Sequence, residues 1–164
     1  MIEYYDIVES LLDNDGSCRD LNFELPTWAG VKKLLALLET DYKEISGTDQ
    51  EGKALPQPFR ESVLIAAKNS GYAHLLFSKG VGLIRNLQVF ICMEKNGTPF
   101  VEISFFPDDV CSTSTLRDDF ITWTQEMQSR LEARRHYARY ENASWQFGDV
   151  SSQSGVFMAS NNIS

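Results

Sequence analysis

Two apolar runs flank Asn96-Gly97. The runs cover residues 87–93 and 100–106, and in the second run Glu102 and Ser104 alternate with apolar residues. An Asn-Gly pair accepts the positive φ angles of a type I′ turn, whose twist matches that of the flanking strands. The pattern therefore predicts a β-hairpin with one buried face and one solvent-exposed face.

Apolar residues spaced by three and four predict a first helix that begins after Thr27. Threonine is a common N-cap, and Gly47 lies just past the expected end, where glycine often caps a helix. The expected buried stripe of this helix is Trp28, Val31, Leu34, Leu35, Leu38, Tyr42 and Ile45.

The same spacing predicts a second helix that begins within residues 112–115 and continues to about Asn142. Its expected buried stripe is Leu116, Phe120, Trp123, Met127 and Leu131. Acidic residues in its first turn and basic residues near its end complement the helix dipole. These residues are Asp118, Asp119, Arg130, Arg134, Arg135 and Arg139.

Shorter segments complete the pattern. Residues 19–24 predict a strand, whereas residues 6–12 fit either a helix or a strand. Residues 63–67 form a hairpin with residues 72–77 or a short helix. The sum is an α+β fold, a mostly antiparallel sheet with two main helices packed on it.

The length of 164 residues is typical of a single domain. We place this domain at residues 1–150. The serine-rich residues 151–164 are expected to form a flexible tail or an edge strand.

Negative charge is concentrated near the amino terminus. The net charge is −8, and residues 1–24 contribute −6 of it, from seven acidic residues and one base, Arg19. Such a field attracts cationic proteins and repels nucleic acid and anionic membranes. We predict a partner-binding surface formed by residues that the turn before residue 19 groups together, namely Asp13, Asp15, Asp20 and Glu24. The alternative is that these acids only keep the protein soluble.

The sequence contains no motif typical of catalysis or metal binding. Asp13 to Gly16 resembles part of an EF-hand loop, but its register places no carboxylate at positions one and twelve. The two histidines and three cysteines show neither metal-ligand spacing nor a nucleophile beside a base. We therefore expect no catalytic residue, no cofactor and no metal, and a protein that is not an enzyme.

The cysteines also indicate the compartment. Cys18, Cys92 and Cys111 are odd in number and far apart, which is typical of reduced thiols. The first residues lack the features of a signal peptide, and no apolar run approaches the roughly 20 residues that span a bilayer. We expect a cytoplasmic protein.

The string Asp15-Gly16-Ser17-Cys18-Arg19-Asp20-Leu21-Asn22-Phe23 is similar to a segment of the immunity proteins of bacterial toxin–immunity systems, of the polymorphic-toxin or contact-dependent inhibition type. The resemblance implies a bacterial protein that binds a cationic toxin domain and occludes its active site or substrate path. The alternatives are a cytoplasmic adaptor domain and a small enzyme whose site the sequence does not reveal.

Overall fold

One eight-stranded antiparallel sheet forms the centre of the molecule. The computed structural model describes residues 1–141 and 155–161, and the strand order is β1-β8-β7-β2-β6-β5-β4-β3. The strands are β1 (Ile2–Glu3), β2 (Arg19–Glu24), β3 (Tyr42–Asp49), β4 (Tyr72–Gly80), β5 (Leu87–Met93), β6 (Pro99–Phe105), β7 (Arg135–Tyr140) and β8 (Val156–Ala159). The helices are α1 (Ile7–Leu12), α2 (Trp28–Asp41), α3 (Phe59–Asn69) and α4 (Leu116–Arg130), with a short 3-10 helix, η1, at Pro107–Asp109.

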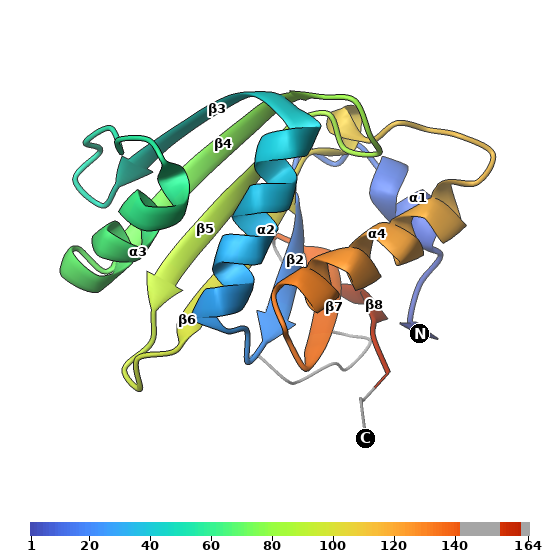
Figure 1. The fold of residues 1–164 in the computed structure, drawn as a ribbon. Helices are drawn as coiled ribbons and strands as arrows, with labels where there is room; N and C mark the ends of the chain where they lie inside the picture. The colour runs from blue at the N-terminus through green and yellow to red at the C-terminus, as the bar shows by residue number, and fades with distance from the viewer. Residues whose placement is uncertain (142–154, 162–164) are drawn as a thin grey trace.

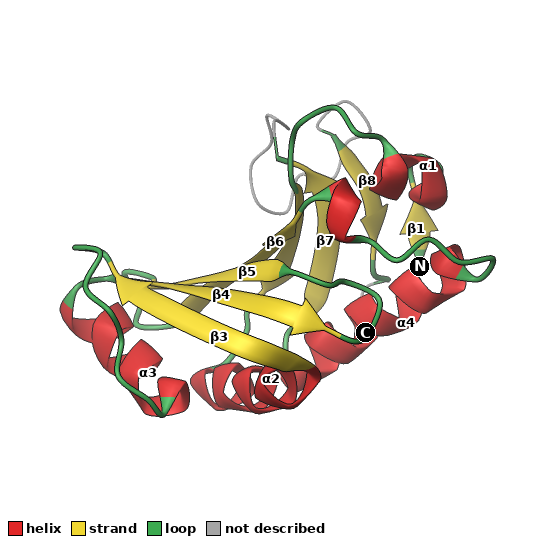
Figure 2. Ribbon diagram, turned by 90° about the horizontal axis from the view of Figure 1, so that it is seen from above, coloured by secondary structure: helices red, strands yellow, loops and turns green. Residues whose placement is uncertain are grey.

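The longer helices α2, α3 and α4 lie on one side of the twisted sheet (Figures 1 and 2). Helix α2 contacts β3 and β6, α3 contacts β4 and β5, and α4 contacts β7. The side chains that β5 and β6 direct towards these helices, such as Val89 and Ile103, are fully buried. The predicted α+β class and antiparallel sheet are confirmed.

The predicted hairpin is confirmed. Strands β5 and β6 pair from Gln88 with Ser104 to Met93 with Pro99, and Gly97 has φ of 84°. The predicted solvent-exposed face is only partly right, because Ser104 is 5% exposed. The Ser104 hydroxyl is hydrogen-bonded to Asp20 of the neighbouring strand β2.

The first predicted helix begins as expected but ends early. The Thr27 hydroxyl caps α2 by accepting a hydrogen bond from the Gly30 amide at 2.9 Å. The helix ends at Asp41, so the prediction that Tyr42 and Ile45 continue its stripe is wrong. These two residues belong to β3, where pairing with β4 outweighs the local helical spacing.

Gly47 has a different role from the predicted one. It lies within β3, opposite Leu75 of β4, and does not cap a helix. A Cβ atom at this position would lie 2.4 Å from Cδ2 of Leu75. Glycine at position 47 therefore allows β3 to pack closely on its neighbours.

The second predicted helix also ends early, at Arg130 rather than near Asn142. Its stripe is largely confirmed, since Leu116, Phe120, Met127 and Leu131 are each at most 1% exposed. The chain then turns and forms β7, whose side chains alternate between the two sides of the sheet. Arg135 and Arg139 lie on this strand, so their predicted pairing with the helix dipole is wrong.

The segments for which the sequence left two possibilities are helices. Asp6 caps α1, with Oδ1 accepting a hydrogen bond from the Glu9 amide at 2.8 Å. Residues 63–67 lie within α3, which follows Pro58. No helix in the described part of the chain has the length and apolar character needed to cross a bilayer.

Strand β8 lies inside the sheet, between β1 and β7. All four of its residues are fully buried. Residues 156–159 are therefore an interior strand, and the edge position belongs to β1. The predicted boundary at residue 150 and residues 151–154 and 162–164 lie outside the described part of the chain.

Candidate partner-binding surface

The side of the sheet opposite α2, α3 and α4, here called the open face, carries no described helix over β2 to β6 (Figure 2). Its side chains alternate with those that face the helices and form three rows across β4, β5, β6, β2 and β7. Four members of these rows are nonetheless buried: Asp20, Asn22, Ser104 and Tyr137. The middle row is His74, Phe90, Glu102, Asn22 and Tyr137. The rows on either side are Leu76, Gln88, Ser104, Asp20 and Arg139, and Tyr72, Cys92, Phe100, Glu24 and Arg135.

Three rings on β4 and β5 form an aromatic patch on this face. The His74 and Phe90 rings are stacked, with centroids 4.5 Å apart and planes 5° apart. The Tyr72 ring lies 6.0 Å from that of Phe90, and the His74 Nε2 atom is 2.8 Å from Oε1 of Gln88. Leu76 beside the patch is 43% exposed. Aromatic side chains held in place in this way supply much of the affinity of protein interfaces.

A polar network joins β2, β6 and β7 next to this patch. Arg139 pairs with Asp20 at 3.2 Å and with Glu102 at 3.5 Å, and its Nε atom donates to Asn22 at 2.9 Å. Asn22 donates to Glu102 at 2.7 Å, and the Ser104 hydroxyl donates to Asp20 at 2.6 Å. These bonds fix the position of each side chain and explain why Ser104 is buried.

Asp20 is 3% exposed, and this burial dominates its electrostatics. Burial and the nearby Glu102 carboxylate raise the pKa of Asp20 to about 6, whereas Ser104 and Arg139 lower it. Asp20 is therefore a buried member of the network that positions Arg139. It offers no free carboxylate to a partner.

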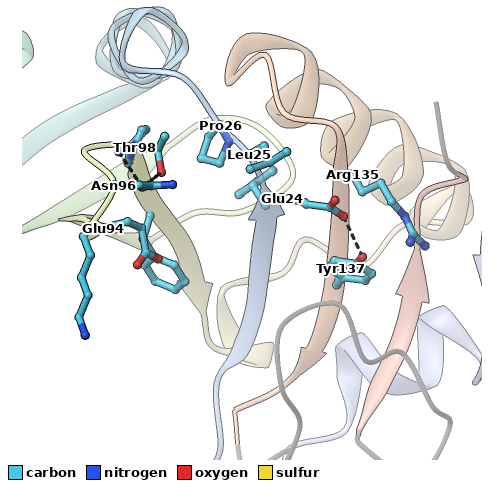
Figure 3. A pocket seen from close by; sticks show the side chains of 12 residues that line it. Glu24, Leu25, Pro26, Glu94, Asn96, Thr98, Arg135 and Tyr137 are labelled. Carbon is cyan, nitrogen blue, oxygen red and sulfur yellow. Dashed lines mark hydrogen bonds between the residues drawn. The ribbon is translucent and has the colours of Figure 1, made fainter. Parts of the chain in front are cut away.

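A groove of about 820 Å³ lies at the end of the open face where β2 ends and the hairpin turns (Figure 3). Its lining is Phe23, Glu24, Leu25, Pro26, Glu94, Lys95, Asn96, Thr98, Pro99, Phe100, Arg135 and Tyr137. The Tyr137 hydroxyl donates to Glu24 at 3.3 Å, and the Arg135 guanidinium lies over the Tyr137 ring, 5.0 Å from its centroid. The groove thus combines apolar walls with a few charged groups, as binding sites commonly do.

The structure does not bring the four predicted partner-binding carboxylates together. Asp20 and Glu24 lie on the open face. Asp13 and Asp15 belong to the loop before β2 and contact Arg19, whose side chain points to the opposite side of the sheet. The turn therefore does not place all four on one side of the sheet, although Asp13 and Glu24 keep exposed carboxylate surface on the two sides. Their role in binding a partner stays a prediction.

Arg19 organises the loop before β2. Its side chain is fully buried, and its Nε atom donates to the Ser10 carbonyl at 2.6 Å. It also pairs with Asp15 at 3.2 Å and lies 3.9 Å from the centroid of the Tyr140 ring. Hydrogen bonds from Ser17 and Arg19 lower the pKa of Asp15, although burial opposes them. The single base of the acidic segment therefore serves the fold.

Basic residues from the end of the chain neutralise much of the remaining acidic segment. Glu3 pairs with Arg117, Asp20 with Arg139, and Glu24 with Arg134 at 3.6 Å. The charge asymmetry in the sequence thus partly reflects pairing between the two ends of the chain.

Burial changes the ionisation of one cysteine and one histidine. Burial, together with Glu141 and Asp20, raises the pKa of Cys18 to about 11, which disfavours its reactive thiolate. Burial, the terminal amino group and Arg135 lower the pKa of His136 to about 4. Within residues 1–141 and 155–161, His, Cys, Asp and Glu side chains form no group that would hold a metal ion.

Sequence reasoning missed most of the open face. Trp28, which belongs to the expected buried stripe of the first helix, packs against the core and donates from Nε1 to the Gly97 carbonyl at 2.8 Å. Arg135, Tyr137 and Arg139 alternate along the chain with His136 and Ala138, and this alternation was the signal for β7. Their spacing also suits a helix that continues from α4, and the helical interpretation concealed them.

Comparison with known proteins yields a likeness of fold. No model of a protein family matches the chain, and no curated protein matches it. It is similar to a chain of the 1.75 Å crystal structure of the toxic C-terminal tip of CdiA from Pseudomonas aeruginosa in complex with immune protein. The TM-score is 0.56 at 16% identity, and the match covers 90% of this chain and 97% of the other. This chain therefore shares its fold with a protein from a toxin–immunity complex, in line with the resemblance found in its sequence.

Proposed function

We propose that this chain is an immunity protein that binds and neutralises a toxin domain in the bacterial cytoplasm. The observation that carries the proposal is the fold, shared over 90% of the chain with a protein from a toxin–immunity complex. In this role the chain catalyses no reaction. It inhibits by covering the toxin's active site or the path of its substrate.

The toxin binds to the open face in this proposal. The aromatic patch provides apolar contact area. In the polar network, the partly exposed Arg139 and Glu102 are already held in position, which lowers the entropic cost of binding. Glu24 contacts the toxin directly, whereas Asp20 acts by positioning Arg139. Asp13 and Asp15, on the other side of the sheet, contribute long-range attraction.

The proposed toxin is basic. The net charge of −8 gives the chain a negative field at long range, in spite of the internal ion pairs. Such a field accelerates encounter with a cationic domain. A toxin that acts on nucleic acid has the cationic surface that this field selects.

Co-expression tests the proposal. Each reading frame that flanks the gene is expressed with and without this chain, and growth and copurification are measured. We expect one product to stop growth alone, to be tolerated with this chain, and to copurify with it at a ratio of one to one. If every flanking product is harmless, or if a toxic one kills cells equally with and without this chain, the proposal is wrong.

Substitutions on the open face locate the interface. Leu76→Arg places a charge beside the aromatic patch and should abolish protection without changing the circular dichroism spectrum, because Leu76 is exposed. Glu126→Gln on α4, on the opposite side of the sheet, should protect as well as the parent chain. Equal protection by both variants would place the toxin on another surface.

A further inference from the structure

The groove at the end of β2 has features of a site for one particular side chain. Leu25 at its rim is 58% exposed and has a left-handed backbone with φ of 53°, a conformation that is costly for leucine. Phe100, which is half-buried, provides aromatic surface in the lining. A side chain that enters the groove therefore meets apolar surface along its length.

Carboxylates lie on both sides of this apolar space. Figure 3 shows Glu24 at the end of β2 and Glu94 at the end of β5 on opposite sides of the groove. Glu24 makes only long contacts, at 3.3 Å to Tyr137 and 3.6 Å to Arg134. The Glu94 carboxylate is exposed, with no hydrogen bond or ion pair to any residue that the structure describes. Both carboxylates can accept further hydrogen bonds.

Two acidic side chains, Glu94 and Glu102, lie near Phe100 on the hairpin side of the groove. Glu102 lies two residues beyond Phe100 on the same face of β6, and Cys92 lies opposite Phe100 on β5. Burial, followed by the charges of Glu94 and Glu102, raises the pKa of Cys92. A cation beside Phe100 is therefore favoured over an anion.

Two bases also line the groove, and one of them, Arg135, is directed away from Glu24. The Arg135 guanidinium stacks on Tyr137 and donates to the Ser160 carbonyl at 3.4 Å, towards β8. Figure 3 shows that it points away from Glu24. Lys95 belongs to the exposed turn of the hairpin.

We infer that the groove receives an arginine side chain of the toxin, with its guanidinium between Glu24 and Glu94 and its stem against Leu25 and Phe100. Arginine fits because its planar, weakly hydrated head stacks on aromatic rings while its donors bind carboxylates on two sides. Its aliphatic stem covers the apolar rim. The inference rests on the proposed function, since the arginine belongs to the toxin.

Nuclear magnetic resonance tests the groove without the toxin. The 15N-labelled chain is titrated with N-acetyl-arginine methylamide and, separately, with the citrulline analogue, which has nearly the same shape and no charge. The arginine compound should shift the amides of Leu25, Glu94 and Phe100, and the citrulline compound should not. No shift at these amides, or equal shifts with both compounds, would overturn the inference.

Matched variants sharpen the test. Glu94→Gln removes a charge that makes no described contact and should weaken binding of the arginine compound roughly threefold. Adding Glu24→Gln should remove the shifts, whereas Glu126→Gln on the helix side should change nothing. Unchanged affinity in Glu94→Gln and in the double variant would also overturn the inference.

The growth assay, together with the measured affinity for the toxin, separates this inference from the proposed function. If the parent chain neutralises a toxin and the Glu24→Gln, Glu94→Gln variant binds that toxin equally tightly, the groove assignment is wrong and the function stands. If the parent chain neutralises no toxin, the function itself is wrong. An affinity loss on the order of tenfold in the double variant, with Glu126→Gln unaffected, supports both.

Discussion

Folding shifts the pKa values of two buried side chains, Asp20 and His136, in opposite directions. Folding raises the pKa of Asp20 from 3.8 to about 6, so the folded state holds this proton more tightly, and the contribution of Asp20 to stability falls as pH rises through this range. Folding lowers the pKa of His136 from 6.5 to about 4, so its contribution to stability rises with pH. Each effect is on the order of 3 kcal/mol, and the two largely cancel.

Removing either group should therefore reveal the other. In Asp20→Asn, the free energy of unfolding, relative to the parent chain, should decrease as pH falls from 6.5 to 4, because only the parent gains stability from protonation of Asp20 in this range. In His136→Gln, the relative free energy should increase over the same range. Urea denaturation at several pH values measures both. The explanation fails if the relative free energies of both variants are independent of pH.

Helix α2 approaches the end of α4 at a residue without a side chain, Gly30. A Cβ atom on Gly30 of α2 would lie 2.2 Å from the carbonyl oxygen of Leu131, just after α4. The Thr27 amide donates to the same carbonyl at 3.1 Å, so the backbone there has little freedom to move. Glycine at position 30 therefore sets the distance between the two helix ends.

Gly30→Ala should lower the thermal midpoint although alanine is the better helix former. The propensity gain of about 1 kcal/mol is smaller than the cost of overpacking against backbone, about 1–3 kcal/mol or more. Gly82→Ala is the control, because a Cβ at Gly82 has no atom within 4 Å. Thermal denaturation by circular dichroism compares them, and equal midpoints would contradict this account.

The sequence contained enough information for some elements and not for others. The hairpin at Gly97 and the cap at Thr27 depend on neighbouring residues, so local patterns identified both. Strand β3 follows α2 directly and β7 follows α4 after a short turn, and the residues of both strands continue the helical spacing. Only pairing with distant strands, β4 and β2, determines where each helix ends.

The candidate site was harder to predict for the same reason. Glu24 was identified, but its location across the groove from Glu94 depends on β2 and the hairpin meeting at one end of the sheet. Asp20 was identified for its charge, whereas its burial depends on Ser104 and Arg139 from other strands. A single sequence shows charges and does not show which of them pair.

At the scale of the whole molecule, acids near the amino terminus pair with bases encoded more than a hundred residues later. These acids also differ in what a charge reversal costs. Asp13 is exposed, while Asp20 is buried against Arg139. Reversal of several acids at once would therefore confuse loss of binding with loss of folding.

Single reversals separate these effects. Asp13→Lys should leave the thermal midpoint nearly unchanged, whereas Asp20→Lys should lower it strongly, because it buries a second cation beside Arg139. The association rate with the toxin should fall roughly tenfold between about 20 mM and about 500 mM salt, and Asp13→Lys should weaken this dependence. Stopped-flow fluorescence measures the rates, and rates that are independent of salt would contradict long-range attraction.

The place of β8 between β1 and β7 has a consequence for synthesis on the ribosome. Strand β1 pairs with β8 and with no other described strand, so its hydrogen-bonding edge stays unoccupied until residues 156–159 have emerged. Pairing among the hairpin strands, β2 and β7 can precede this event, but the pairing of β1 with β8 cannot. The first and last described strands must therefore join the sheet together, as the late step of a fold rich in contacts between distant residues.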